Sequence, residues 1–133
     1  MTTIKKLAAI RQALEKYHFS IHVLKEQIAE LDQAGVCTGV VHWRKGNGKD
    51  KMYANHGIDR GCPIHGQPRP GRRLRVYIGT DSMAQDYVKE AIEHYDQKQT
   101  VKAKIHHIEI RRSRVEGAVT VAWRHATGSQ RWE

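Results

Sequence analysis

Basic and aromatic side chains alternate along short segments in the middle of the chain. Residues 35–80 hold nine Lys and Arg residues and two acidic residues, whereas residues 81–100 hold two basic and five acidic ones. In an extended strand, residues two positions apart lie on the same face, so Arg73, Arg75 and Tyr77 would share one surface. Cations neutralise phosphates and rings stack on bases, a combination typical of a nucleic-acid-binding surface.

Further residues could enlarge this surface. A preceding hairpin would add Lys51 and Tyr53, together with Trp43, and the arginines of a neighbouring loop could hold phosphates as an arm. The alternative is that Arg and Tyr simply occupy the wet face of an antiparallel sheet, and that the C-terminal arginines only aid solubility. The predicted contact set is Trp43, Arg44, Lys45, Lys49, Lys51, Tyr53, Arg69, Arg72, Arg73, Arg75, Tyr77, Arg111, Arg112 and Arg114.

One pair of side chains has the spacing of metal ligands. Two residues separate Cys62 from His65, which lets such a pair hold one Zn²⁺, and His56 or His42 could supply a further ligand. Structural zinc takes four ligands, usually from two such pairs, and Cys37 lies far away in the sequence. We therefore expect no cofactor, and keep zinc at Cys62, His65 and His56 as the alternative.

The segment from Tyr77 to Ser82 ends a hydrophobic strand in Gly-Thr-Asp-Ser. It resembles the first strand of ribonuclease-H-like nucleases, and the resemblance implies a metal-dependent nuclease that uses Asp81. A helix is expected after Asp81 in place of the second strand, and helix capping by Asp81 or Ser82 accounts for the motif. Because the sequence also has no P-loop, dinucleotide fingerprint, nucleophile elbow or His-Glu-x-x-His motif, we expect a protein without enzymatic activity.

The N-terminal residues predict one long helix. From Ile4 to Leu31 the apolar residues follow a heptad repeat, Thr3 is a candidate N-cap, and Gly35 follows the last apolar position. The helix could associate with a second copy of the chain or pack against the second helix and the sheet, and both alternatives stay open. The seam consists of Leu7, Ile10, Leu14, Tyr17, Ile21, Leu24, Ile28 and Leu31.

The centre of the chain predicts strands. After Gly35 the pattern changes to a period of two, which indicates a β-hairpin, and a loop containing all three prolines follows. The clearest strand comes next, and its Leu74, Val76 and Ile78 should face the core. The expected elements are strands at 36–44 and 51–55, a turn at 45–50, a loop at 56–71 and a strand at 73–79.

A second amphipathic helix is expected from Asp81 or Ser82 to about Lys98, with Ser82 and Gln85 forming a Ser-x-x-Gln capping box. Its buried stripe would comprise Met83, Tyr87, Val88, Ala91, Ile92 and Tyr95. The residues that follow are expected as an extension or strand at 103–111, a turn at 113–117 and a strand at 118–124, which is rich in Val and Thr.

Together these elements predict an α+β fold with a long N-terminal heptad helix, an antiparallel sheet of three to five strands and a second amphipathic helix. We expect the helix at 1–34, a basic α+β domain at 35–124 and a flexible tail at 125–133. This plan is similar to that of the arm-binding domains of phage-type integrases, whose three-stranded sheets dock on DNA.

The expected function is that of a small, non-enzymatic protein that binds DNA or RNA, as an accessory or regulatory factor of a phage or mobile element. A protein-interaction module or inhibitor of a nucleic-acid enzyme is an alternative, because a basic face also fits an acidic protein groove. No stretch approaches the roughly 20 apolar residues that span a bilayer, and the start has no signal-peptide pattern. We expect a cytoplasmic location, no membrane partner and reduced cysteines.

Overall fold

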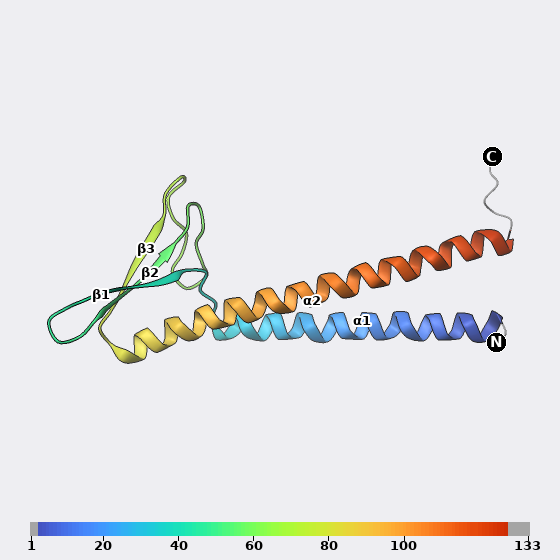
Figure 1. Ribbon diagram of the computed structural model, residues 1–133, viewed down its shortest axis with the longest axis horizontal. Helices are drawn as coiled ribbons and strands as arrows, with labels where there is room; N and C mark the ends of the chain where they lie inside the picture. The colour runs from blue at the N-terminus through green and yellow to red at the C-terminus, as the bar shows by residue number, and fades with distance from the viewer. Residues whose placement is uncertain (1–2, 128–133) are drawn as a thin grey trace. The chain divides into compact units, whose positions relative to one another are not determined.

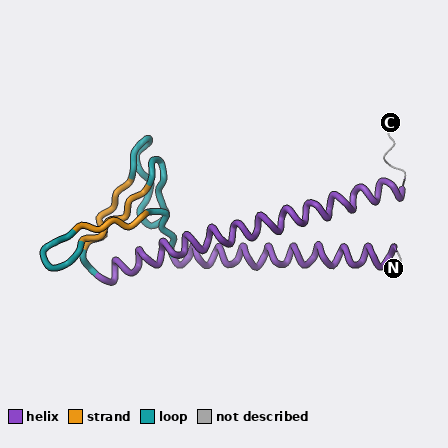
Figure 2. Tube along the Cα trace, viewed as in Figure 1, coloured by secondary structure: helices purple, strands orange, loops and turns teal. Residues whose placement is uncertain are grey.

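The computed structural model describes residues 3–127, which form two helices and one three-stranded sheet (Figure 1). Figure 2 shows the strands joined by loops between the two helices in chain order. The elements are α1 (Thr3–Ala34), β1 (Val40–Arg44), β2 (Lys51–His56), β3 (Leu74–Gly79) and α2 (Ser82–Thr127). The expected α+β class, long N-terminal helix and antiparallel sheet are confirmed.

The chain divides into two compact units. Residues 27–100 form the sheet unit, which contains all three strands, the end of α1 and the start of α2. The helical unit consists of α1 up to Glu26 and α2 from Val101. Each long helix therefore contributes one part to each unit.

The sheet has the strand order β1-β2-β3, and both neighbouring pairs are antiparallel. One face packs against α2, where Met52, Ala54 and Val88 are buried together. Burial of a large apolar side chain contributes about 1.5–3 kcal/mol, so this contact holds the helix on the sheet. The partly buried side chains around it are Val41, Val76, Ile78 and Ile92. Val76 and Ile78 thus face the core, as predicted, and Leu74, which pairs with the buried His56, lies on the same side of the sheet.

The strand expected over 36–44 begins only at Val40. The residues before it bond elsewhere: the N–H of Cys37 donates to the carbonyl of Ala91 on α2 (3.0 Å), and the Thr38 hydroxyl donates to a loop carbonyl (3.0 Å). A backbone held by a helix and a loop cannot also form the ladder with β2. The other two strands match their expected ranges within one residue.

α1 ends where the sequence predicts. Gly35 follows it with a φ of 110°, and its N–H donates to the carbonyls of Leu31 (3.1 Å) and Asp32 (3.2 Å). Only glycine adopts such a φ without strain, so Gly35 stops the helix. Two contacts tie this end to α2: Lys98 Nζ lies 2.7 Å from Asp32 Oδ1, and His94 Nδ1 donates to the Gly35 carbonyl at 2.8 Å.

α2 does not end near Lys98 but continues to Thr127. The expected turn at 113–117 and strand at 118–124 are therefore wrong, and 103–111 is helical. Beyond residue 100 the covered positions recur at alternating spacings of four and three, the pattern of a helix seam. Burial along one helix face overrides the weak strand preference of the Val and Thr residues. The covered positions on this line are Val101, Ile105, Ile108, Arg112, Val115 and Val119, and Glu109 beside it is also partly covered.

In the helical unit, α1 and α2 run antiparallel to each other (Figure 1). Its buried side chains, among the described residues, are Ile21 of α1 and Val101 and Ile105 of α2. Toward the start of α1 the heptad seam is less covered, and Leu7 is 48% exposed. Intramolecular packing therefore covers part of the seam, and association with a second copy through the seam stays a prediction.

Asp81 is the N-cap of α2. Its Oδ2 accepts the N–H of Ala84 (3.1 Å), and its carbonyl accepts the first helical bond, from the N–H of Gln85 (3.0 Å). The expected capping box of Ser82 and Gln85 is wrong, because Gln85 Nε2 donates instead to the Gly79 carbonyl at the end of β3 (2.9 Å). Capping by Asp81, the other alternative drawn from the sequence, is confirmed.

The buried stripe of α2 in the sheet unit is narrower than expected. Val88 and Ala91 are buried, but Met83 and Tyr87 are 81% and 48% exposed. Met83 and Tyr87 lie beside the line of least exposed positions on α2, which follow one another at spacings of four and three residues. That line consists of Ala84, Val88, Ala91 and Tyr95, and Ile92 beside it is also partly buried in the core, as expected.

Neither helix, over the described residues 3–127, has an apolar stretch long enough to cross a membrane. The tail expected at 125–133 begins inside α2, where His125 is helical and exposed. Residues 128–133, on which the rest of that prediction falls, lie outside the described residues.

Replacing Asp81 with Ala should lower the free energy of unfolding by about 1 kcal/mol, because the Ala84 N–H loses its partner. Asp81→Asn should leave stability nearly unchanged, since Asn caps as well as Asp. Ser82→Ala is the matched control and should change stability by less than about 0.5 kcal/mol. Urea unfolding followed by circular dichroism measures all three, and a larger loss in Ser82→Ala than in Asp81→Ala would contradict this capping arrangement.

Candidate functional site

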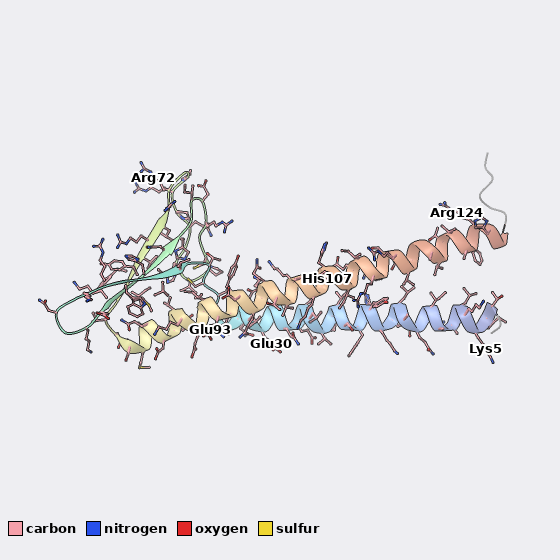
Figure 3. The ribbon with its side chains drawn as sticks, in the orientation of Figure 1. Lys5, Glu30, Arg72, Glu93, His107 and Arg124 are labelled. Carbon is pink, nitrogen blue, oxygen red and sulfur yellow. The ribbon has the colours of Figure 1, made fainter. Side chains whose placement is uncertain are left out.

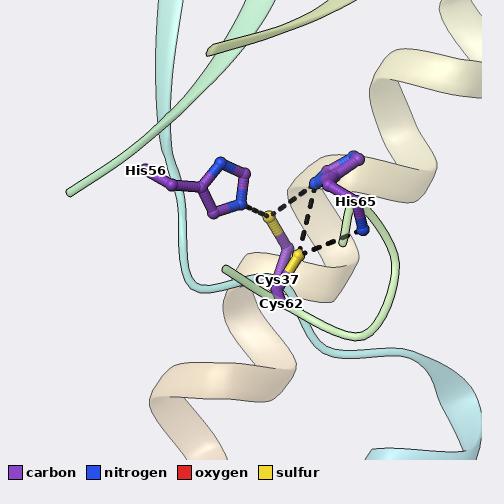
Figure 4. A group of neighbouring side chains, drawn as sticks. All are labelled: Cys37, His56, Cys62 and His65. Carbon is purple, nitrogen blue, oxygen red and sulfur yellow. Dashed lines mark hydrogen bonds between the residues drawn. The ribbon is translucent and has the colours of Figure 1, made fainter. Parts of the chain in front are cut away.

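Four side chains of metal-binding type meet inside the sheet unit (Figure 4). Cys37 precedes β1, His56 ends β2, and Cys62 and His65 lie in the loop between β2 and β3. One donor atom from each side chain lies within 4.8 Å of the other three. We call this group, which could hold a metal ion, the metal centre. In the described part of the chain, no other cluster of three or more His, Cys, Asp or Glu side chains is arranged to hold an ion.

The distances between the donor atoms fit a tetrahedral metal ion. Cys37 Sγ lies 3.6 Å from His56 Nε2 and 3.5 Å from His65 Nδ1, and Cys62 Sγ lies 3.3 Å from His65 Nδ1. With Zn–S of about 2.3 Å and Zn–N of about 2.1 Å, a tetrahedral site places a sulfur and a nitrogen ligand about 3.6 Å apart. An ion could therefore bind with little movement of the chain.

Backbone groups also prepare the donors. The N–H of Gly39 donates to Cys37 Sγ, and the N–H of His65 donates to Cys62 Sγ, both at 3.4 Å. Such bonds favour the thiolate form. His56 Nδ1 lies 3.3 Å from the Leu74 carbonyl, and a proton on Nδ1 donated to that oxygen leaves Nε2 free as a ligand. Second-sphere bonds of this kind are typical of metal-binding histidines.

The metal centre is withdrawn from solvent. The exposed fractions of Cys37, Cys62 and His56 are 0%, 2% and 2%. Burial raises the pKa of the Cys37 thiol to about 11, the N–H of Gly39 opposes this rise, and the Cys62 sulfur adds to it. Burial, and then the neighbouring His56, lower the pKa of His65. Uncharged imidazoles are the form that binds metals, and a dication would stabilise the thiolates that burial disfavours.

The metal centre lies where a loop meets a helix. Cys37 and Cys62 pack with Ala91 of α2, and Ile64 packs against them. The loop turn is closed by reciprocal backbone bonds between Cys62 and Gly66, at 3.1 and 2.8 Å. The sulfur and nitrogen donors are therefore held by a tight turn on one side and by α2 on the other.

Sequence spacing identifies three of the four members. Cys62, His65 and His56 come together, as the zinc alternative required. His42, the other histidine considered, is not part of the centre and lies on the opposite face of the sheet. Spacing alone misses Cys37, because it assumes that ligands come in close pairs.

The hairpin explains why Cys37 belongs to the centre. Val40 at the start of β1 pairs with Asn55 near the end of β2, so the residues just before β1 must lie beside His56. The register of the hairpin indicates this proximity, because an antiparallel hairpin brings the start of its first strand beside the end of its second. The register can be derived from the sequence only if the turn is placed correctly, and the spacing of the ligand residues does not place the turn.

The other side of the sheet, which we call the open face, carries cations around aromatic rings. Tyr53 of β2 pairs with Tyr77 of β3, and their ring centroids are 5.1 Å apart. The guanidinium carbons of Arg75 and Arg44 lie 4.3 and 5.7 Å from the centroid of the Tyr53 ring. Lys51 pairs with Arg44 and shares this face. The register thus groups Lys51, Tyr53, Arg75 and Tyr77 as expected.

Trp43 does not belong to the open face, and its expected place there is wrong. It pairs with the buried Met52, which puts it on the side covered by α2. There Lys89 Nζ of α2 lies 5.3 Å from the centroid of its ring. Strand alternation gives the open face His42 and Arg44 instead.

The other predicted contact residues of the sheet unit lie at its edges. The turn between β1 and β2 carries Lys45 and Lys49, and the loop before β3 carries Arg69, Arg72 and Arg73, all exposed. Figure 3 shows Arg72 projecting from that loop near β3. These cations are placed to extend a charged surface beyond the strands themselves.

The C-terminal arginines are arranged differently from expectation. Arg111, Arg112 and Arg114 lie within α2 rather than at a turn, and they belong to the helical unit. Arg112 is partly buried, and its Nε lies 3.7 Å from a carboxylate oxygen of Glu116. They are therefore not part of the open face.

Comparison with known proteins finds no matching family model, no similar curated protein and no similar solved structure. Two features of the sheet unit could carry a function: the buried metal centre and the cationic open face.

Gly39 lies close to the metal centre, and a larger residue there should disturb it. A Cβ at this position would meet His56 ring atoms at 3.1 Å and the Asn55 carbonyl oxygen at 3.2 Å. Gly39→Ala should therefore lower the free energy of unfolding by about 1–3 kcal/mol, the usual range for overpacking. In Gly57→Ala, the control, the nearest atom is a flexible Arg60 carbon at 3.4 Å, and the change should stay within about 0.5 kcal/mol. Equal losses in both variants on urea unfolding would contradict the crowding around His56.

Proposed function

We propose that this chain is a small, non-enzymatic nucleic-acid-binding protein whose sheet unit is stabilised by one structural zinc ion. The observation that carries the proposal is the open face, where guanidinium groups gather around Tyr53 and have no carboxylate partner among residues 3–127. The zinc ion would hold together the segments that present this face.

Charge supports a polyanionic partner. Arg44, Arg73 and Arg75 form no ion pair with a carboxylate in the described part of the chain. Glu90 and Glu93 are instead exposed on α2, the helix that covers the other face of the sheet (Figure 3). Phosphates bound to the open face would neutralise its cations and release counterions, which drives nucleic-acid binding.

The donor set supports zinc in a structural role. Two thiols and two imidazoles in a tetrahedral arrangement are typical ligands of Zn²⁺. Four protein donors would complete its coordination and leave no position for water or substrate. The burial of the centre agrees with that role, because a catalytic metal needs an open position.

Zinc and nucleic-acid binding are connected through the strands. The loop that follows His56 returns the chain to Leu74, the first residue of β3, and carries Cys62 and His65 in between. An ion bound to these residues and to Cys37 would fix the ends of all three strands together with the loop arginines. The affinity for nucleic acid should therefore depend on the metal.

The full-length protein should bind one Zn²⁺ per chain. Cys37→Ser and Cys62→Ser should both lose that ion, although one cysteine precedes the sheet and the other lies in the loop. His42→Asn, which removes a histidine outside the centre, is the matched control and should keep it. Metal content by mass spectrometry gives the stoichiometry, and Co²⁺ substitution should give the visible absorption of a tetrahedral site with thiolate ligands.

Removing the ion with a strong chelator should lower the Tm, and adding Zn²⁺ back should restore it, because the ligand set is complete only in the folded chain. Unchanged zinc content in Cys37→Ser, or loss of zinc in His42→Asn equal to that in the cysteine variants, would place the metal elsewhere.

Replacing Arg73 and Arg75 together with Ala should weaken nucleic-acid binding by roughly tenfold for each guanidinium lost. It should also lower the slope of log affinity against log salt by about 1.4–1.8, since two phosphate contacts disappear. Fluorescence anisotropy with labelled oligonucleotides at several salt concentrations measures both effects.

Lys102→Ala/Lys104→Ala is the charge-matched control, because both lysines are exposed on α2 within the helical unit. It should keep nearly the affinity of the parent protein. No retention of any DNA or RNA probe at low salt by the zinc-loaded parent would overturn the proposed function, and equal losses in the two double variants would show that only net charge matters.

A further inference from the structure

We propose that the open face binds a single strand rather than a duplex, with a phosphate beside Arg44, Arg73 and Arg75 and a base stacked on Tyr77. The inference rests on the proposed nucleic-acid function and adds the form of the ligand and the place of its parts. The proposed site has two parts, a cationic depression and the exposed ring of Tyr77, and a short series of side-chain contacts connects them.

A depression of ≈ 430 Å³ opens on the sheet, and all three strands line it. His42 and Arg44 come from β1, Asn55 from β2, and Arg73 and Arg75 from β3 and the residue before it. No acidic residue is among those that line it. Three guanidinium groups around one hollow repel each other, and an anion with several oxygens, such as a phosphodiester, matches their forked donors.

The Tyr53 ring holds two of these cations in place. Arg75 lies 4.3 Å and Arg44 5.7 Å from its centroid, and cation–π contacts of this kind restrain otherwise flexible side chains. A bound phosphate would thus meet guanidinium groups that are already oriented. Less conformational entropy is then lost on binding than with free arginines.

Asn55 adds a second kind of contact. Asn55 lines the same depression as the arginines, and its Oδ1 is buried and has no hydrogen-bond partner among the described residues. An amide oxygen accepts hydrogen bonds and does not bind an anion. Rotation of the Asn55 side chain toward the depression would let this oxygen accept a hydrogen bond from a donor beside the phosphate, such as a base amino group or a ribose hydroxyl.

Tyr77 offers the stacking surface. Its side chain is 56% exposed, and its centroid lies 5.1 Å from that of Tyr53, which in turn contacts Arg75. The ring and the depression are thus neighbours on one face. A base can lie on this ring only if it has left its own stack, which an unpaired strand allows and an intact duplex does not.

The test uses the zinc-loaded full-length protein with four labelled 12-mers of one sequence: single-stranded DNA, single-stranded RNA and the two duplexes. Fluorescence anisotropy should show binding to the single strands that is at least about tenfold tighter than to either duplex. Tyr77→Leu should weaken single-strand binding by about 5- to 150-fold, the effect of losing one base–ring stack. Tyr77→Phe keeps the ring and should bind as the parent does.

The outcomes separate this inference from the proposed function. Duplex binding as tight as single-strand binding would overturn the inference and leave the nucleic-acid function in place. So would a Tyr77→Leu variant that binds every probe as the parent does, while Arg73→Ala/Arg75→Ala loses affinity. Absence of binding to all four probes would overturn both. Circular dichroism of each variant, which should match the parent, excludes loss of folding as the cause of a weaker affinity.

Discussion

Four thiol and imidazole side chains share one small buried space, and the arrangement of the sheet unit depends on them. Buried polar groups must find partners, and here the closest partners of the donors are one another and two backbone N–H groups. This requirement explains why the segment before β1 leaves the ladder: Cys37 has to reach His56 and the loop. It also explains the glycine at position 39, where any side chain would displace the His56 ring. A dication bound by all four donors would link the three segments that carry them.

The strand β2 shows how one short segment serves both sides of the sheet. Met52, Ala54 and His56 alternate inward, two of them into the apolar contact with α2 and the third into the metal centre, while Tyr53 and Asn55 alternate outward. The apolar core of this unit is small, and a small core supplies only a few kcal/mol of net stability. A metal bond to His56 would therefore strengthen the same strand that carries the central ring of the open face. Stability and the proposed binding would thus depend on alternate residues of one strand.

The sequence predicts the features of this structure that depend on neighbouring residues better than those that depend on residues distant in the sequence. The heptads of α1, the strand with Leu74 and Ile78 inward, and the helix start at Asp81 all follow from neighbouring residues, and they are found. Three errors come from long-range effects. Residues 118–124 have the composition of a strand, but they are helical, and Val119 continues the line of covered positions on α2. That line can be recognised only once the helix is known to continue past Lys98. Cys37 joins the centre through hairpin register rather than spacing. Trp43 falls on the inner face for a related reason, because its parity depends on where the strand starts.

The two features of the sheet unit should act on each other through stability. Like charges repel each other, so the arginines around Tyr53 oppose folding when nothing is bound. A polyanion reverses the sign of that interaction and stabilises the folded sheet by mass action. Zinc would stabilise the same folded state through His56 and the loop. Because both ligands prefer one conformation, each must raise the apparent affinity for the other by the same factor. That reciprocity would make the metal centre contribute to the proposed binding, although of its four residues only His56 lines the depression.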